Sequence, residues 1–561
     1  MRGFAGVLDW KREAAESFTC QDAAVNAQRE VTAAAEGGLY NRNEIQNELS
    51  NAGYRFAKNG TLADLFLAAY LHWGDGFVER FAGAFAFAIW DAREQRMILG
   101  RDQLGMKNLY YSDRGSVIPF ATELKQVLAH PAVSRTVTGE GLAELFLKGP
   151  YFSPGNAVFS DVREVKPGHL VICTTAGTKN ICYWNLQSLP HEDSLEQTVS
   201  TLDKLLNAHV SEWKELPTPP TLILSGGLDS SGLMGMMHRS FGQAHPEWKS
   251  FSGNTAESYE AEDTEDLDFV WVRRMAEHFG VTNEEVLYDF AAAWERNDLP
   301  RHLHALPTQA KFEAMLHQIY SVIKPQNPCV VIGEGADELF ASTHHFYSER
   351  RVGDASQPWL PEQPAIYASP DVLRSIRAEE YAREQGAALF REVSLLPGDD
   401  EPNVRMRQLT YLMIKEYLPY LLRRNGLITD DVGVRLQMPF VDHRLAQYAW
   451  NIPWEMKNYR NQPKGVLRQV FRSYLPDAVI DRKKSNQPVV FKSPYAQKLR
   501  QAAERFLQDR NAPLYDLVDR GQIRKTLDEG VIERDKLMRW RLDYYLQIDH
   551  WMREYGVEVK I

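Results

Sequence analysis

The chain has 561 residues, 44% of them hydrophobic, which is enough for more than one domain and for substantial buried cores. A formal net charge of -11 argues against general nucleic-acid binding, because that function relies on basic surfaces. No apolar run approaches the roughly 20 residues of a membrane-spanning helix. Residues 1–4 begin a strand directly, which leaves no room for a signal peptide. We therefore expect a cytoplasmic protein whose partners include neither a nucleic acid nor a membrane.

The first third of the sequence consists of short apolar runs separated by turns. Strands are predicted at 85–90, 97–99, 109–111 and 117–121, and a helix at 63–73. Strands and helices in separate runs are typical of a layered α+β domain. Cys173 and Cys182 lie in alternating, strand-like sequence and are predicted to be reduced core residues. The polar segment 187–196, which contains a proline, is the predicted end of this domain.

The remainder of the chain has a different pattern, in which strands alternate with helices. Strands are predicted at 221–224, 248–253 and 329–332, with a helix at 267–279. This alternation indicates a parallel sheet covered by helices, and the pattern after residue 376 is mostly helical.

A glycine-rich loop at residues 225–231, Ser-Gly-Gly-Leu-Asp-Ser-Ser, follows the first of these strands and precedes a helix. Glycines allow a tight turn and present bare N–H groups, and the helix adds the positive end of its dipole. Hydroxyls and an acid complete a cradle for phosphate and a magnesium ion. The loop lacks the Gly-Lys-Ser/Thr ending of the P-loop. It matches the pyrophosphate-binding loop of enzymes that split ATP into AMP and pyrophosphate. The alternative is an ordinary glycine turn before a helix.

A second motif, Gly-Glu-Gly-Ala-Asp-Glu at residues 333–338, follows the strand predicted at 329–332. Ligands of open parallel sheets bind at the carboxyl ends of the strands, so both loops are expected to face one crevice. Asp229 and Asp337 would then share a magnesium ion, and Glu334 would contact an incoming amine or an acyl-adenylate. The alternative is an acidic helix N-terminus that is stabilised by the helix dipole.

A lysine opens a third segment, residues 462–468, which begins another predicted helix. Lys464 is expected to reach the phosphates as a mobile point charge. A lone lysine at such a position is usually a surface residue, but the two loops together favour the functional interpretation.

These three segments together resemble the asparagine synthetase family, and the resemblance covers nearly the whole chain. Residues 85–91, 101–107 and 120–125 are similar to its glutaminase domain, and residues 438–444 and 481–484 to its synthetase domain. The resemblance implies an Ntn-hydrolase-like, glutaminase-type domain over residues 1–190. It further implies an ATP pyrophosphatase domain, of the adenine nucleotide alpha hydrolase-like type, over residues 191–561 with a helical C-terminal part.

The resemblance also implies an AMP-forming ligase that uses ATP and Mg²⁺. A carboxylate attacks the α-phosphorus of ATP, pyrophosphate leaves, and an amine then displaces AMP from the acyl-adenylate. The residues assigned to ATP are Leu224, Ser225, Gly226, Gly227, Asp229, Ser230, Ser252 and Gly333. Asp229 and Asp337 are assigned to the metal, and Glu334 and Lys464 are the catalytic candidates.

The front domain lacks several glutaminase signatures of the family. Arg2 stands where the amidotransferases carry their cysteine nucleophile, and a guanidinium group is no nucleophile. Glu36 begins the segment that corresponds to the oxyanion motif, where a carboxylate would repel an oxyanion rather than donate to it. The acids of another family motif are absent from residues 59–62. These differences imply a domain that no longer hydrolyses glutamine.

The synthetase half departs from the family as well. The altered positions are Gly426, Leu427, Thr429, Asp430, Arg435 and Gln437. ATP-facing residues are kept while acceptor-facing ones are changed, which indicates activation of a carboxylate other than aspartate.

The leading hypothesis is an ATP-dependent amide ligase that receives its amine directly. Lasso peptide cyclases and β-lactam synthetases are relatives of this kind. Macrolactam formation on a peptide is favoured because the altered acceptor region suits a peptide. The partners would be a carboxylate and an amine, with a precursor peptide and its processing protease. The alternatives are an asparagine synthetase that uses ammonia or glutamine, a β-lactam synthetase-like small-molecule ligase, and a non-catalytic scaffold. Retention of Asp229, Glu334, Asp337 and Lys464 opposes the scaffold.

Overall fold

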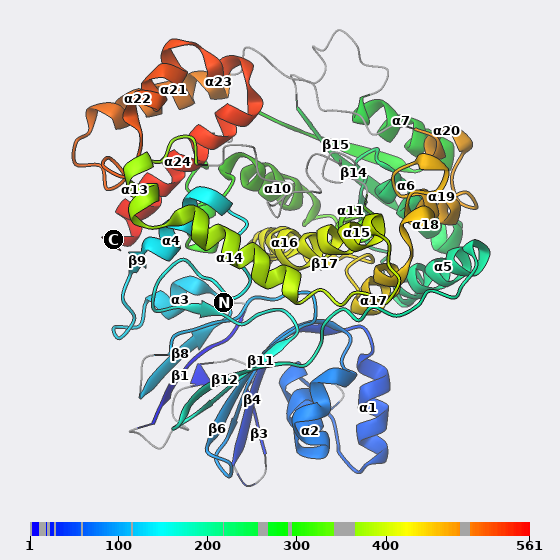
Figure 1. Ribbon diagram of the computed structural model, residues 1–561. Coiled ribbons are helices and arrows are strands. Elements are labelled where there is room, and N and C mark those ends of the chain that lie inside the picture. Colours follow the sequence, from blue (N-terminus) through cyan, green and yellow to red (C-terminus); the bar gives the residue numbers. More distant parts are fainter. Residues whose placement is uncertain are drawn as a thin grey trace.

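The fold divides into a strand-rich N-terminal part and a larger, helix-covered part above it (Figure 1). The computed structural model describes residues 3–10, 18–19, 23–26, 28, 30–57, 60–113, 116–216, 218–255, 267–289, 294–341, 365–482 and 494–561. The predictions that concern Arg2 and Asn59 lie outside these residues.

The N-terminal part contains two antiparallel sheets that pack face to face. One has the order β10 (Arg163–Glu164), β7 (Tyr110–Tyr111), β8 (Val117–Ala121), β1 (Ala5–Asp9) and β2 (Phe18–Thr19). The other has the order β12 (Gly177–Cys182), β11 (His169–Thr174), β6 (Arg96–Arg101), β5 (Gly83–Asp91), β4 (Val31–Leu39) and β3 (Ala24–Val25). Between them lies a core that includes Leu8, Trp90, Leu99 and Phe120. The four strands predicted in this part are confirmed, and they pair as the neighbours β5 with β6 and β7 with β8.

Two helices, α1 (Arg42–Asn51) and α2 (Leu62–Trp73), cover the opposite face of the six-stranded sheet. Alternate residues of β5 make this possible, because Phe85 and Phe87 face the helices while Ala86 and Ala88 face the other sheet. The order of layers is helices, sheet, sheet, as expected for the predicted α+β domain.

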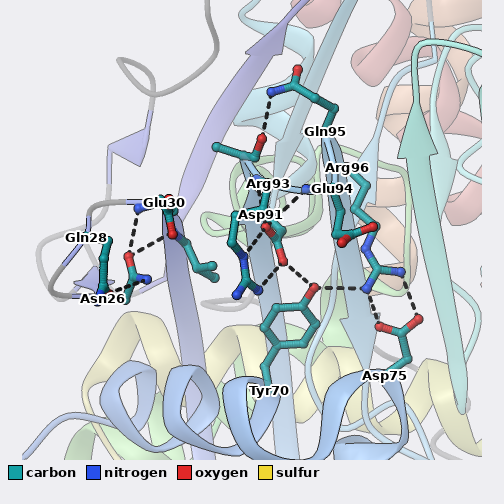
Figure 2. Close-up of polar contacts among 12 residues, drawn as sticks. Asn26, Gln28, Glu30, Tyr70, Asp75, Asp91, Arg93, Glu94, Gln95 and Arg96 are labelled. Carbon is teal, nitrogen blue, oxygen red and sulfur yellow. Dashed lines mark hydrogen bonds and ion pairs between the residues drawn. The ribbon is translucent and has the colours of Figure 1, made fainter.

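The turn between β5 and β6 is fixed to α2 by polar contacts (Figure 2). The buried Asp91 carboxylate accepts a hydrogen bond of 2.8 Å from the Tyr70 hydroxyl and is paired with Arg93. Arg96 reaches Tyr70 at 3.0 Å and Asp75 at 2.8 Å. Burial alone would raise the pKa of Asp91, but the hydrogen bonds from Arg93 and Tyr70 lower it to about 2. This acid therefore stays ionised and holds the helix against the hairpin.

The second part contains a five-stranded sheet in which every neighbouring pair is parallel. Its order is β15 (Thr282–Tyr288), β14 (Lys249–Thr255), β13 (Thr221–Ile223), β16 (Cys329–Val331) and β17 (Arg435–Gln437). The three predicted strands are confirmed, whereas β15 and β17 were not predicted. The chain runs from β13 to one side and then resumes at β16 on the other side. The point between β13 and β16 is thus a topological switch point, where such sheets bind ligands.

Helices surround this sheet and form most of the C-terminal region (Figure 1). They are α5 (Leu195–Glu212), α6 (Leu228–Met237), α7 (Asp268–Phe279), α9 (Leu299–His304), α10 (Ala310–Ile323), α11 (Ala336–Leu339), α13 (Pro370–Ser375), α14 (Ala378–Arg391), α15 (Glu401–Leu412), α16 (Leu418–Val432), α17 (His443–Asn451), α18 (Trp454–Lys457), α19 (Gly465–Phe471), α20 (Asp477–Ile480), α21 (Pro494–Gln508), α22 (Arg520–Asp528), α23 (Val531–Arg534) and α24 (Lys536–Tyr555). A π-helical turn, η6 (Met413–Tyr417), joins α15 to α16. Across the described ranges, no helix combines the length and the apolar character needed to cross a membrane.

The end of the chain returns to its first third. Strand β18 (Glu558–Lys560) pairs in parallel with β9 (Thr136–Thr138), and α3 (Leu124–Leu128) and α4 (Gly139–Ala143) share a core with α24. The predicted domain boundary at residue 190 falls between β12 and α5 and stays a prediction.

One prediction about the cysteines is wrong. Cys173 is buried, but Cys182 is exposed, because it lies at the end of β12, which is the edge strand of its sheet. An edge strand has no neighbour to cover it on its outer side, so the alternating pattern did not place this residue in the core.

Candidate active site

The candidate site lies at the carboxyl ends of β13 and β16, on either side of the switch point. The glycine-rich loop follows β13, and the Glu334 loop follows β16. Ser252 lies in the neighbouring β14, so the three strands bring the predicted ATP residues to one edge of the sheet.

The loop after β13 is held by its own hydroxyls. The Ser225 and Ser230 hydroxyls lie 3.0 Å apart, and the Ser225 N–H donates to Ser230 Oγ at 3.1 Å. Gly226 has a φ of +76°, and a Cβ atom there would lie 2.3 Å from the carbonyl oxygen of Asp268. Only glycine fits this position. Gly227 is the N-cap of α6 and has no side chain to cap the first turn, and the N-terminus of a helix favours an anion.

Two further predicted ATP residues are buried beside this loop. Leu224 is inaccessible to solvent, and its N–H donates to the Phe251 carbonyl at 2.7 Å. Ser252 is 3% exposed, and its hydroxyl accepts a hydrogen bond of 2.9 Å from Asn283. These contacts fix the wall of the crevice, while the assignment of both residues to ATP stays a prediction.

The loop after β16 packs directly against the first loop. A Cβ atom at Gly333 would lie 3.2 Å from Asp229 Cβ and 3.4 Å from the Ser230 nitrogen. Gly335 has a φ of +96°, a conformation that favours glycine. The two glycines of this motif therefore permit the close approach of the two loops.

Lys464 joins the two loops. Its ammonium group donates to Asp229 Oδ2 and lies 2.6 Å from Asp337 Oδ1. The lysine is 5% exposed and, with a φ of +56°, is the N-cap of α19. Burial would lower the pKa of Lys464, but Asp229 and Asp337 raise it above its usual range, so the group is a permanent cation. Three predicted site residues that are far apart in the sequence thus meet at one point.

Glu334 lies beside this cluster and faces α16. Its Oε2 accepts a hydrogen bond of 3.1 Å from the Asn425 amide and lies 3.8 Å from the Arg424 guanidinium. Burial raises the pKa of Glu334, and Arg424 opposes this shift. Glu338 is almost fully buried, and burial followed by the charges of Asp337 and Glu334 raises its pKa to about 8.

Sequence reasoning missed Arg424, Asn425 and Glu338 as members of the site. No local signal separates Arg424 from the preceding arginine, Arg423, which instead faces Glu164 of the N-terminal part at 3.7 Å. The helical turn of about 100° per residue sends these neighbours in different directions. The altered family pattern at residues 426–437 was the only sequence signal near these two residues.

The carboxylates fit a magnesium ion that arrives with a substrate. Asp229 and Asp337 flank one point, and Mg²⁺ is usually bound by one or two carboxylates together with substrate phosphates. Within the described part of the chain, no group of three or more His, Cys, Asp and Glu side chains has the geometry of a metal site. The donor set therefore suits a substrate-borne ion rather than an all-protein metal cage.

In the N-terminal part, the segment that corresponds to the glutaminase oxyanion motif contains an ion-pair chain. Glu36 lies 2.7 Å from the Lys107 ammonium, which lies 2.8 Å from Asp430 of α16. A Cβ atom at Gly3 would lie 3.0 Å from Glu36 Oε2, so this ion-pair chain borders the start of the polypeptide. Two positions that differ from the family pattern, Glu36 and Asp430, thus share one lysine across the domain joint.

The structure joins a parallel sheet, with a glycine-rich loop at its switch point, to an antiparallel two-sheet domain. The sequence model of the asparagine synthase family matches residues 201–553, and that of the glutamine amidotransferase domain matches residues 10–184. The chain belongs to the asparagine synthase family and is an AMP-forming carbon–nitrogen ligase. Its predicted Ntn-type and ATP pyrophosphatase-like domains are confirmed.

Individual relatives extend over most of the chain. Asparagine synthetase [glutamine-hydrolyzing] 3 of Bacillus subtilis (strain 168) is 29% identical over 93% of this chain and 87% of that protein. Amidase chry2 of Gibberella zeae is 25% identical over 81% of this chain and 76% of that protein. Among solved structures, glutamine phosphoribosylpyrophosphate amidotransferase from Bacillus subtilis covers 47% of each chain at 14% identity, with a TM-score of 0.21. That score is too low to carry a conclusion.

Proposed function

We propose that this ligase adenylates a substrate carboxylate and joins it to an amine that arrives directly, without glutamine hydrolysis. The observation that carries the proposal is the cluster of Lys464, Asp229 and Asp337 beside the glycine-rich loop. Two observations support the absence of a glutaminase step. Arg2 stands where the family's amidotransferases carry their nucleophile, and Glu36 is paired with Lys107.

The first step would take place on the glycine-rich loop. The N–H groups of the loop and of the first turn of α6 would hold the pyrophosphate. The Lys464 ammonium would move from its carboxylate partners to the phosphates and stabilise the negative charge that develops on them. Asp229 and Asp337 would hold Mg²⁺, which would supply positive charge to the phosphates when bound.

The second step would take place beside Glu334. A carboxylate with a raised pKa is a better proton acceptor for an amine than an ordinary surface carboxylate. Asn425 and Arg424 hold this side chain from one side, which orients its oxygen atoms. Glu334 would therefore position the amine and accept its proton as the amide forms.

We further propose that the acid and the amine belong to one peptide, so that the product is a macrolactam as in lasso peptide cyclases. Attack within one pre-folded chain gains a large effective concentration. The changes at positions that face the acceptor in the family, among them Gly426 and Leu427, support a substrate other than aspartate.

The test supplies the purified full chain with Mg²⁺-ATP and one set of substrates at a time. The substrates are L-aspartate with ammonium, L-aspartate with L-glutamine, a small β-amino acid alone, and linear peptides with a free N-terminal amine and an internal Asp or Glu. Pyrophosphate and AMP are measured together with the mass of the product. We expect AMP with a peptide that loses one water, and no glutamate from glutamine.

Other outcomes have definite meanings. Asparagine from aspartate and ammonium would replace the macrolactam proposal with an asparagine synthetase, and glutamate from glutamine would overturn the absence of a glutaminase step. Cyclisation of a small β-amino acid in place of a peptide would favour a β-lactam synthetase-like ligase. The Lys464→Met variant is the matched control, because any product of this crevice must disappear with it.

A further inference from the structure

A second cavity, with a volume of about 350 Å³, lies where the N-terminal sheets meet α14 and η6. Its polar lining comes from both parts of the chain: Lys166, His169, Cys182 and Asn185 from one part, and Glu392 and Lys415 from the other. None of these residues belongs to the nucleotide crevice described above.

Lys415 is the buried cation of this cavity. It lies in the π-helical turn η6 and is 8% exposed. Its ammonium group is 5.1 Å from the centre of the Trp184 ring and 5.7 Å from that of Tyr411. Within the described residues it forms no hydrogen bond and no ion pair, and burial lowers its pKa to about 8. A buried ammonium that has no hydrogen bond and no ion pair is costly to keep, and an anion in the cavity would lower that cost.

The other polar groups leave the cavity with an excess of positive charge. The His169 Nδ1–H faces the Pro167 carbonyl at 2.8 Å, and burial lowers the pKa of this imidazole, so the ring is neutral. Cys182 donates to the Trp184 carbonyl. Glu392 is the one acid of the lining, and it accepts a hydrogen bond of 3.0 Å from the Tyr411 hydroxyl. Lys415 and the second lysine of the lining therefore outweigh a single, already engaged carboxylate.

We propose that this cavity binds a small organic anion through its carboxylate group, with Lys415 and Lys166 as the cationic partners and Asn185 as a further hydrogen-bond donor. The rest of the lining favours an organic molecule over an inorganic ion, because Leu389 and Pro167 contribute apolar surface that a carbon chain would cover. The volume is sufficient for an acid of several carbon atoms. This inference does not depend on the identity of the ligase substrates.

The test measures binding to the full-length protein by calorimetry, with acetate, succinate, L-glutamate and inorganic phosphate as probes. In the Lys415→Met variant, the methionine keeps the contacts with Trp184 and Tyr411 but removes the charge. The matched control is Lys457→Met, which removes another buried lysine with a lowered pKa, outside this cavity. We expect a carboxylate probe to bind the wild type and Lys457→Met at least about tenfold more tightly than Lys415→Met.

A second measurement does not require the variant to fold. Lys415 should react with an amine-selective reagent near pH 8, where about half of it is uncharged, and the bound probe should protect it, as judged by mass spectrometry. Binding should also weaken above pH 8, with Lys166, His169, Cys182 and Glu392 as the other groups that face the ligand. Absence of binding by every carboxylate probe, equal binding by Lys415→Met, or tighter binding of phosphate than of any carboxylate would overturn the proposal.

Discussion

Two lysines of this protein each lie between two carboxylates, yet their surroundings differ. Lys464 connects Asp229 and Asp337 at the edge of the parallel sheet. Lys107 connects Glu36 of the N-terminal sheet to Asp430 of α16. The exposed fractions are similar, with 33% for the Asp337 side chain and 32% for that of Asp430, so burial alone does not separate the two clusters.

The backbone around each cluster makes the difference. Asp229 and Asp337 lie in the first turns of helices, beside a glycine loop with uncapped N–H groups, so the site attracts a second anion such as a phosphate. Glu36 lies within a paired strand, and Asp430 lies in the last turn of α16, where the helix dipole disfavours an acid. Lys107 therefore neutralises the charges of Glu36 and Asp430 and holds the N-terminal sheet against α16.

The largest expected effect comes from the Lys464→Met variant. With the acid that the ligase accepts, we expect pyrophosphate release to fall by at least about 100-fold, because one preorganised charge at the reacting phosphates is lost. The measurement is steady-state pyrophosphate release with Mg²⁺-ATP. The same substitution at Lys107 is the control, and its rate should stay within a few-fold of the wild type. Comparable losses in both variants would abolish the distinction between the two clusters.

The Lys107→Met variant should instead lose stability. Glu36 and Asp430 would keep their charges without the shared cation, and we expect the free energy of unfolding to fall by about 2 kcal/mol, between the values for exposed and buried ion pairs. Urea unfolding followed by tryptophan fluorescence measures this. Adding Asp430→Asn to that variant should restore part of the loss, since one of the two negative charges that Lys107 balanced is then removed. An unchanged midpoint in the single variant would contradict this role of Lys107.

Asp543 gives the smallest expected effect and shows how a buried acid behaves when it forms no ion pair. It lies in α24, accepts a hydrogen bond of 2.7 Å from Tyr495, and forms no ion pair within the described chain. Burial raises its pKa from 3.8 to about 6. The folded state therefore binds the proton more tightly than the unfolded state, and stability falls as the pH rises through this window. We expect a slope on the order of 1 kcal/mol per pH unit.

The Asp543→Asn variant should remove this slope, because an amide does not titrate in the window. Thermal unfolding of both proteins between pH 4 and pH 7 compares the two dependences. A slope that survives in the variant would assign the dependence to another group.

Several elements could be predicted because their signals are local. The alternating run at residues 85–90 defines β5, and the apolar run before Ser225 defines β13, in each case to within a few residues. Strands β15 and β17 were not predicted. The first, Thr-Asn-Glu-Glu-Val-Leu-Tyr, is mostly polar, and the second has three residues, so neither carries the hydrophobic pattern of a strand. Pairing with an existing sheet, rather than local propensity, makes them strands.

The residue types of the crevice follow from short motifs in the sequence: glycines where the backbone must turn, acids and hydroxyls after a strand, and a lysine at a helix start. Those choices are dictated by local chemistry. The ion pairs of Lys464, the contact of Arg424 but not Arg423 with Glu334, and the chain from Glu36 through Lys107 to Asp430 join residues far apart in the chain. Which of these charges meet depends on sheet order and on the direction of each helix face, and these arise from packing over the whole molecule.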